Sequence, residues 1–150
     1  MIPEKKRYEA KQEIRQAVLN RLKEAAETGG RLEEVDSVVD RDRVRGVPHL
    51  PGIFLVREDE RITKQSIGEN VDYTLSLLVL VTHDQPDEGL DLAERLRDEA
   101  VTVVCQGRLG LDYVSEVTPI EGMSPSPGQE DGRRIGSIGV IKVSYQIIPV

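Results

Sequence analysis

The chain has 150 residues, 38% hydrophobic and 31% charged, with a formal net charge of −7 at pH 7, which predicts one soluble domain with a modest core. Aromatic residues make up 3% and tryptophan is absent, so the core must be aliphatic and base-stacking platforms are lacking. The acidic excess argues against nonspecific nucleic-acid binding, because that binding needs Lys and Arg to displace counterions from phosphate.

Cysteine content and hydropathy indicate the cellular compartment in which the protein is expected to work. Cys105 is the single cysteine, so an intrachain disulfide and a zinc cluster of several thiolates are excluded and a reducing, intracellular setting is favoured. The basic stretch 1–15 is not followed by an apolar run, so it is not a secretory signal. No apolar run approaches the roughly 20 residues of a membrane helix, and we expect no membrane contact.

The first predicted element is a helix from Pro3 to Thr28, ended by Gly29-Gly30. Residues 1–9 have almost no apolar face and are predicted to form a mobile end, either helix projecting into solvent or a tail. Leu19 is expected to lie beside the apolar stripe. The stripe itself recurs at steps of three and four residues, which is typical of one buried helix face: Ala10, Ile14, Val18, Leu22 and Ala25.

A short strand is predicted over Ser37 to Arg43, before Gly46, Pro48 and Pro51 interrupt regular structure. The aspartates of this region alternate with arginines, which favours a solvated strand over a metal site.

The next segment is predicted to be a hairpin. Ile53 to Val56 forms an apolar first arm, Glu58-Asp59-Glu60 a turn, and Arg61 to Ser66 a polar second arm at the sheet edge.

A long central strand is predicted from Asn70 to His83. The apolar centre of this stretch is also compatible with a helix, but polar and apolar residues alternate at both ends, which favours a strand. One face is apolar throughout: Tyr73, Leu75, Leu77, Val79 and Val81. The other is apolar only in the middle, as expected for a strand covered fully on one side.

After an acidic loop, Asp87 is expected to cap a second helix that runs to about Gln106. Val101 to Val104 is poor in helix propensity, so either packing overrides propensity or the helix ends a turn early. Its inward stripe is Leu92, Ala93, Leu96, Ala100, Val103 and Val104.

Two strands are predicted to close the chain, Leu111 to Ile120 and Ile135 to Val150, with a mobile loop over residues 121–134 between them. Ile141, Val143, Tyr145 and Ile147 share one face of the last strand. The fold class is therefore α+β, in the order α-β-β-β-α-β-β, with a mainly antiparallel sheet and both helices on one face.

No convergent catalytic set is evident in the sequence. His49 and His83 have no metal-ligand spacing, and Cys105 follows two valines, which favours an inert, buried thiol. Gly107-Arg108-Leu109-Gly110 lacks the residues of a phosphate loop. We therefore expect no catalytic residues, no cofactor and no metal site, and predict that the protein is not an enzyme.

The element order and several segments resemble the tail terminator (tail completion) proteins of long-tailed bacteriophages. The resemblance covers nearly the whole chain as a pattern of elements, without a sharp motif. The segments that carry it are EIRQAVLNRLKEA in the first helix, Pro51 to Val56, Tyr73 to Val81, Leu92 to Val104 with the Gly-Arg-Leu-Gly turn after it, and the final strand.

This resemblance implies a structural virion protein of the tail, assembled in the host cytoplasm. Such proteins form a ring, usually a hexamer, at the head-proximal end of the tail tube, where they stop tube growth and provide the surface for head–tail joining. The implied partners are further copies of the chain, the tail tube protein, head–tail connector proteins and, in contractile tails, the sheath protein. DNA would pass through the ring without specific binding.

Two alternatives remain: another phage neck or head–tail joining protein, and a non-catalytic small binding domain. Within the ring interpretation, the predicted hairpin supplies one of the two different patches that head-to-tail contacts need. The interface residues predicted there are Phe54, Arg57, Glu58, Glu60, Arg61 and Lys64.

Overall fold

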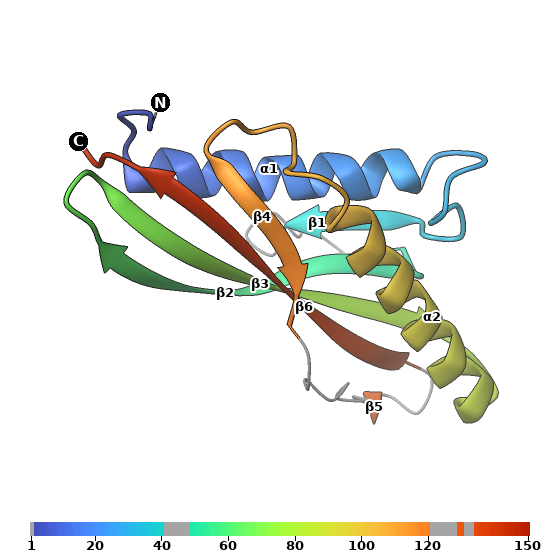
Figure 1. Ribbon diagram of the computed structural model, residues 1–150. Helices are drawn as coiled ribbons and strands as arrows, with labels where there is room; N and C mark the ends of the chain where they lie inside the picture. Colours follow the sequence, from blue (N-terminus) through green and yellow to red (C-terminus); the bar gives the residue numbers. More distant parts are fainter. Residues whose placement is uncertain (1, 41–48, 121–128, 131–133) are drawn as a thin grey trace.

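The computed structural model describes residues 2–40, 49–120, 129–130 and 134–150 (Figure 1). It confirms the predicted α+β class and the order α-β-β-β-α-β-β, with a short strand, β5, added between the last two. The elements are α1 (Arg7–Ala25), β1 (Ser37–Asp40), β2 (Gly52–Lys64), β3 (Glu69–Thr82), α2 (Pro86–Val104), β4 (Val114–Pro119), β5 (Gln129–Glu130) and β6 (Arg134–Ile147).

The sheet has the strand order β1-β2-β3-β6-β4, and β5 pairs separately with β6. β3 and β6 form its centre, because they pair along their whole length, from Glu69 opposite Ile147 to Thr82 opposite Arg134. β1 runs parallel to β2, and the other pairs are antiparallel. The predicted central strand Asn70 to His83 is thus confirmed as β3, and its helical alternative is excluded.

The predicted hairpin between Ile53 and Ser66 is wrong. β2 runs from Gly52 to Lys64 without a turn and pairs with β3, interrupted by one bulge at Val56. The turn lies at Gln65–Gly68, where the Gln65 N–H donates to the Gly68 carbonyl at 3.0 Å and Gly68 has a φ of 79°, which glycine adopts without steric cost. The charged residues after the bulge alternate between the two faces of a strand, so their density does not mark a turn.

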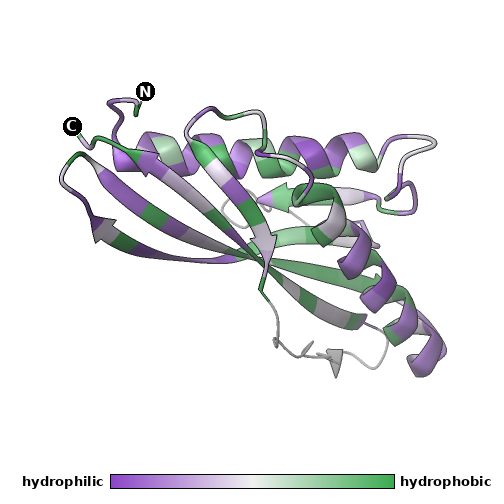
Figure 2. Cartoon of the chain, viewed as in Figure 1, coloured by the Kyte–Doolittle hydropathy of each residue, from purple (hydrophilic) through white to green (hydrophobic). Residues whose placement is uncertain are grey.

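Both helices cover the same face of the sheet, as predicted. Ile14, Leu22 and Leu96 from the two helices join one hydrophobic cluster with the apolar face of β3. The β3 members of that face are at most 1% exposed: Val71, Tyr73, Leu75, Leu77, Val79 and Val81. Figure 2 shows hydrophobic and hydrophilic residues alternating along these strands. The opposite face of the sheet, called here the open face, carries the intervening residues.

α1 is shorter than predicted and differs in two details. Leu19, expected beside the stripe, is buried at 6% exposure. Residues 2–6 are not helical; Glu4 pairs with Ile148 beyond β6, and the Lys5 N–H donates to the Ile148 carbonyl at 3.0 Å. Figure 1 shows the two chain ends side by side at the start of α1.

α2 begins one residue earlier than its predicted cap. Gln85 occupies the cap position, and Asp87 lies inside the first turn, where its negative charge still favours the helix dipole. The helix continues through the valines to Val104, so packing overrides their propensity. Of the predicted stripe, Leu92 is half-buried, and Gly89 lies buried on that side of the helix.

The remaining predicted segments are partly described. β1 confirms a strand at Ser37, although residues 41–48 lie outside the described residues. β4 occupies the middle of the predicted strand Leu111 to Ile120. The predicted loop 121–134 lies mostly outside the described residues, apart from β5 and Arg134. Neither described helix is long and apolar enough to cross a membrane.

Candidate functional site

The structure divides the six predicted interface residues among three environments along β2. Phe54 is buried at 6% exposure. Glu58 and Glu60 lie on the helix-covered face, because they stand opposite Leu75 and Tyr73 of β3. The remaining three are exposed and make no ion pair with any described residue: Arg57, Arg61 and Lys64.

Glu58 and Glu60 are already engaged by α1. Lys11 lies 3.4 Å from Glu60, and an Arg15 nitrogen lies 3.7 Å from Glu58. Arg15 also pairs with Asp40 at the end of β1. These contacts fix α1 across the strands, so the two glutamates stabilise the monomer and are less available to a partner than the prediction assumed.

Tyr73 extends this polar layer into the core. Its hydroxyl donates to the Glu58 carboxylate, and its ring is 1% exposed. Burial, followed by the neighbouring Glu58 carboxylate, raises the pKa of Tyr73, so the phenol stays neutral and remains a donor. Sequence reasoning missed this contact, because it joins a strand to a residue assigned to a turn.

A further ion pair joins the start of α1 to the start of β3. Arg7 donates two hydrogen bonds to Glu69, at 2.8 and 2.6 Å, in the bidentate geometry that makes arginine–carboxylate pairs strong. The Glu69 side chain is 4% exposed. The hydrogen bond from Arg7 lowers the pKa of Glu69, and this effect outweighs desolvation, which acts in the opposite direction.

A third cluster packs beside the chain ends. Lys5 and Tyr113 both donate to Glu13, at 2.6 and 2.8 Å, and these bonds lower the pKa of that carboxylate. The Tyr113 ring meets Tyr145 edge to face, with centroids 6.1 Å apart. The Tyr145 hydroxyl is buried without a hydrogen-bond partner among the described residues. Tyr113 also lines a surface hollow of about 200 Å³, but its hydroxyl is already bonded to Glu13, so we assign the cluster a structural role.

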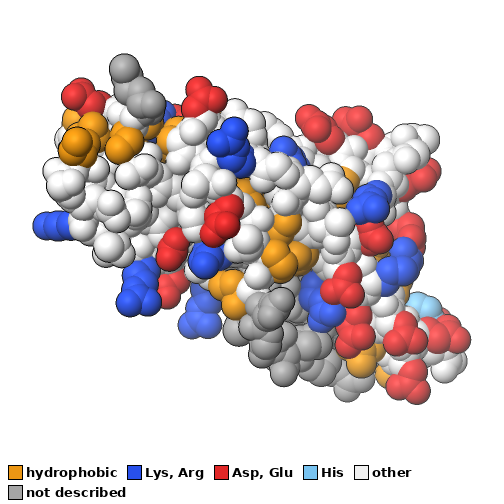
Figure 3. Space-filling model, viewed as in Figure 1, with side chains coloured by type: hydrophobic (Ala, Val, Ile, Leu, Met, Phe, Trp, Pro, Cys, Tyr) orange, Lys and Arg blue, Asp and Glu red, His pale blue; other side chains and the backbone are white. Residues whose placement is uncertain are grey.

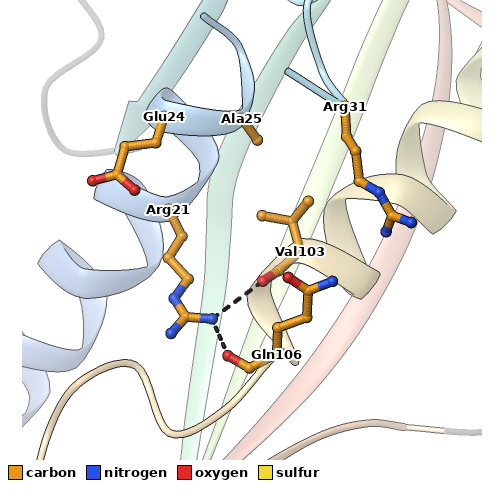
Figure 4. Close-up of a pocket in the computed structure, with 6 residues that line it drawn as sticks. All are labelled: Arg21, Glu24, Ala25, Arg31, Val103 and Gln106. Carbon is orange, nitrogen blue, oxygen red and sulfur yellow. Dashed lines mark hydrogen bonds between the residues drawn. The ribbon is translucent and has the colours of Figure 1, made fainter. Parts of the chain in front are cut away.

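Two surface hollows are candidate ligand sites. The hollow between the ends of α1 and α2 measures about 430 Å³ (Figure 4). Arg21 points across it and donates to the carbonyls of Gln106 and Val103, which terminates α2 in the way cations stabilise helix C-termini. Arg31 lies on the opposite rim, 3.6 Å from Glu99. Both guanidinium groups therefore have structural partners.

The second hollow, of about 460 Å³, lies on the open face of the sheet. Its floor is Thr74, Ser76 and Val140, with Arg57 and Asp59 on one side and Ile120 on the other. Beside it, Ser144 donates to Asp72 at 2.8 Å. The open face thus presents mixed charge over a partly apolar floor, which suits a protein contact more than catalysis.

The two histidines and the cysteine, which are the side chains with potential catalytic or metal-binding chemistry, lie apart from one another. His83 accepts a hydrogen bond from the Gln85 N–H at 2.9 Å and lies 3.5 Å from Glu88, while His49 is exposed near β2. Cys105 ends α2 half-buried, and burial raises the pKa of its thiol. Among the described residues, no three metal-ligating side chains lie together.

Acidic side chains gather at the end of the molecule where α2 begins (Figure 3). Asp84, Asp87, Glu88 and Asp91 are exposed there. Such a run along the outer side of a helix is typical of a solvated face.

Comparison with protein-family models and with curated proteins finds no match to this chain.

Proposed function

We propose that this chain is a structural virion protein that forms a ring at the head-proximal end of a phage tail tube. The ring terminates tube growth and provides the surface for head–tail joining. The proposal rests on the resemblance of the element pattern to tail terminator proteins. The observation that supports it is the β2–β3 arm, the part of the 13- and 14-residue strands that extends past β1. On the arm, β2 carries exposed cations that have no ion-pair partner among the described residues.

The arm gives each copy a patch of a kind that head-to-tail contacts require. Arg57, Arg61 and Lys64 have no ion-pair partner among the described residues, so an approaching protein can pair with them without first breaking an internal bond. At a contact rim, such charges fix register and speed association more than they add affinity. The net charge of −7 favours a pore through which DNA slides without adhering, because like charges repel phosphate.

The test uses purified tail tubes. Wild-type protein should appear at one tube end in electron micrographs and stop tube elongation. Arg61→Glu combined with Lys64→Glu should cap tubes poorly while keeping the wild-type circular dichroism spectrum. Lys6→Glu combined with Lys23→Glu is the matched control, because it makes the same charge change at exposed positions near the ends of α1.

Wild-type protein that never reaches tube ends would refute the terminator role. Binding to a portal complex instead would favour another neck protein, the first alternative. The second alternative, a small binding domain, is favoured by the open-face hollow of about 460 Å³. That alternative predicts a monomer at every protein concentration.

A further inference from the structure

Besides the outer edge of β1, which ends the strand order, two strand edges of the sheet are not covered by another described strand. On one side, β1 pairs with Gly52–Leu55 alone, which leaves β2 outermost from Arg57 to Lys64 (Figure 1). On the other side, β4 pairs with β6 and ends the strand order. An uncovered edge offers backbone groups to a strand from another chain.

The hydrogen-bond alternation identifies the outward groups of β2. The Gln65 N–H donates to the Gly68 carbonyl at the turn. From this pair onwards, opposite residues of β2 and β3 alternate between pairs that exchange backbone hydrogen bonds and pairs that do not. Thr63 and Arg61 bond inward to β3, whereas Ile62 and Lys64 direct their N–H and C=O groups outward. These outward residues lie on the helix-covered face.

The same argument applies to β4. The Ile120 N–H bonds the Val140 carbonyl, so Thr118 and Glu116 bond inward to β6, opposite Lys142 and Ser144. Val117 therefore points its backbone groups outward, and its side chain lies on the helix-covered face. Neighbouring strands β2, β3, β6 and β4 alternate in direction, so the two free edges run antiparallel.

We propose that the free edge of β2 pairs with the β4 edge of a second copy, antiparallel, with Ile62 opposite Val117 of that copy. This inference rests on the proposed ring and names its contact. A rotation that brings one copy beside the next keeps the helices on the same side of the joined sheet. The outward residues of both edges share that side, so the pleats of the two strands match.

Charge and backbone chemistry support this register. Glu116 of the second copy faces Thr63 and lies diagonal to Arg61, within reach of an opposite-charge contact. The pairing stops where Glu60 would lie opposite Pro119 of the second copy. The Glu60 N–H already donates to the Asp59 carboxylate at 2.9 Å, and Pro119 has no N–H to donate. The paired segment is therefore short, so association should be weak and concentration-dependent.

A two-fold pairing of β2 with the β2 of another copy is the competing arrangement. It would place Ile62 opposite its own counterpart and use the same edge of both copies. Because each copy then has no second contact, assembly would stop at dimers.

The test is a disulfide between two exposed positions on the proposed contact. In a Cys105→Ser background, Thr63→Cys and Glu116→Cys stand opposite each other as a non-bonded pair, about 4.5 Å apart between Cα atoms, which suits a disulfide. Within one copy the two positions are separated by three strand spacings, about 14 Å, so they cannot bridge internally. The matched control replaces Glu116→Cys with Asp91→Cys, on the exposed side of α2.

Oxidation at high protein concentration should give a ladder of multimers for the 63–116 pair, with the 63–116 disulfide identified by mass spectrometry, and monomers for the control. Adding a charge in the cysteine-free protein, Thr63→Glu, should weaken self-association in sedimentation about fivefold, because it places like charges opposite each other. Glu116→Lys should then restore association.

Monomers alone, or dimers alone, for the 63–116 pair would overturn the edge pairing. Rings that form without a 63–116 disulfide would also overturn it while leaving the terminator role intact. A 63–116 ladder from a protein that fails to cap tail tubes would establish the edge pairing and refute the terminator role.

Discussion

At the scale of residues, two buried tyrosines on neighbouring strands differ in whether the hydroxyl has a hydrogen-bond partner. Tyr73 donates to Glu58, whereas the Tyr145 hydroxyl has no partner among the described residues. Tyr73→Phe should lower the free energy of unfolding by about 0.5–1.5 kcal/mol, through the lost hydrogen bond. Tyr145→Phe should be neutral or stabilising, because it removes an unsatisfied buried group. Denaturant titrations of both variants would refute this if Tyr145→Phe proved the more costly change.

The Arg7–Glu69 pair predicts the response of stability to acid. The pKa of Glu69 is lower in the folded chain than in the unfolded one. The pair therefore contributes stability above the unfolded value, about 4.3, and this contribution is lost as pH falls through the folded pKa.

Glu69→Gln should destabilise the protein at neutral pH and flatten the loss of stability below about pH 4.3. Thermal unfolding measured across that range tests this. Glu116→Gln is the control, an exposed carboxylate without an ion pair among the described residues. Equal pH profiles for wild type and Glu69→Gln would show that the pair does not govern the acid response.

At the scale of elements, the sequence predicted the strands and helices that have one apolar face and failed where both faces carry polar residues. β3 and β6 were recognised because their buried faces alternate regularly. β2 was misread because its outer half packs glutamates against α1 and shows arginines to solvent. The bulge at Val56 also places Phe54 and Arg57 on the same face, and a bulge leaves no clear signal in side-chain pattern.

The candidate interface was predictable to the extent that its residues are exposed. Arg57, Arg61 and Lys64 are free of ion pairs among the described residues, as an interface needs, but Glu58 and Phe54 are not available in the same way. The sequence shows that residues alternate between the two faces of a strand. It does not show which of those faces a helix covers, because that depends on tertiary packing. Ile62 and Val117, which the proposed edge pairing places opposite each other, could not be predicted from sequence, because a free backbone edge has no side-chain signature.

The contact between α2 and β6 depends on Gly139. A Cβ atom there would lie 2.7 Å from Val101 Cγ2 and 3.0 Å from Arg97 Cγ, closer than packed side chains allow. Gly139→Ala should therefore cost about 1–3 kcal/mol by overpacking. Val101→Ala added to it should recover part of that loss, as a double-mutant cycle by urea denaturation would show. If the losses from Gly139→Ala and Val101→Ala simply add, the Cβ atom at position 139 does not clash with Val101.

At the scale of the whole molecule, the two helices cover most of one face of the sheet, and the other face is only partly buried. Leu77 and Leu78 are adjacent in sequence, yet Leu77 is fully buried beneath the helices and Leu78 is half-buried on the open face. Their pairing partners, Leu55 and Phe54, lie on the same two faces, although Phe54 on the open face is buried at 6% exposure. The stability of the monomer should therefore depend on one of these two leucines far more than on the other.

Leu77→Ala should lower the free energy of unfolding by about 2–5 kcal/mol, because it removes buried methyl groups and leaves a cavity. Leu78→Ala deletes the same atoms where water already reaches them, so it should cost less, about 1 kcal/mol or below. Urea denaturation of the two variants measures the difference directly. Equal losses would mean that the open face is as well packed as the helix-covered face. A loss of tube capping in Leu78→Ala, with stability retained, would place the open face within the assembled contact.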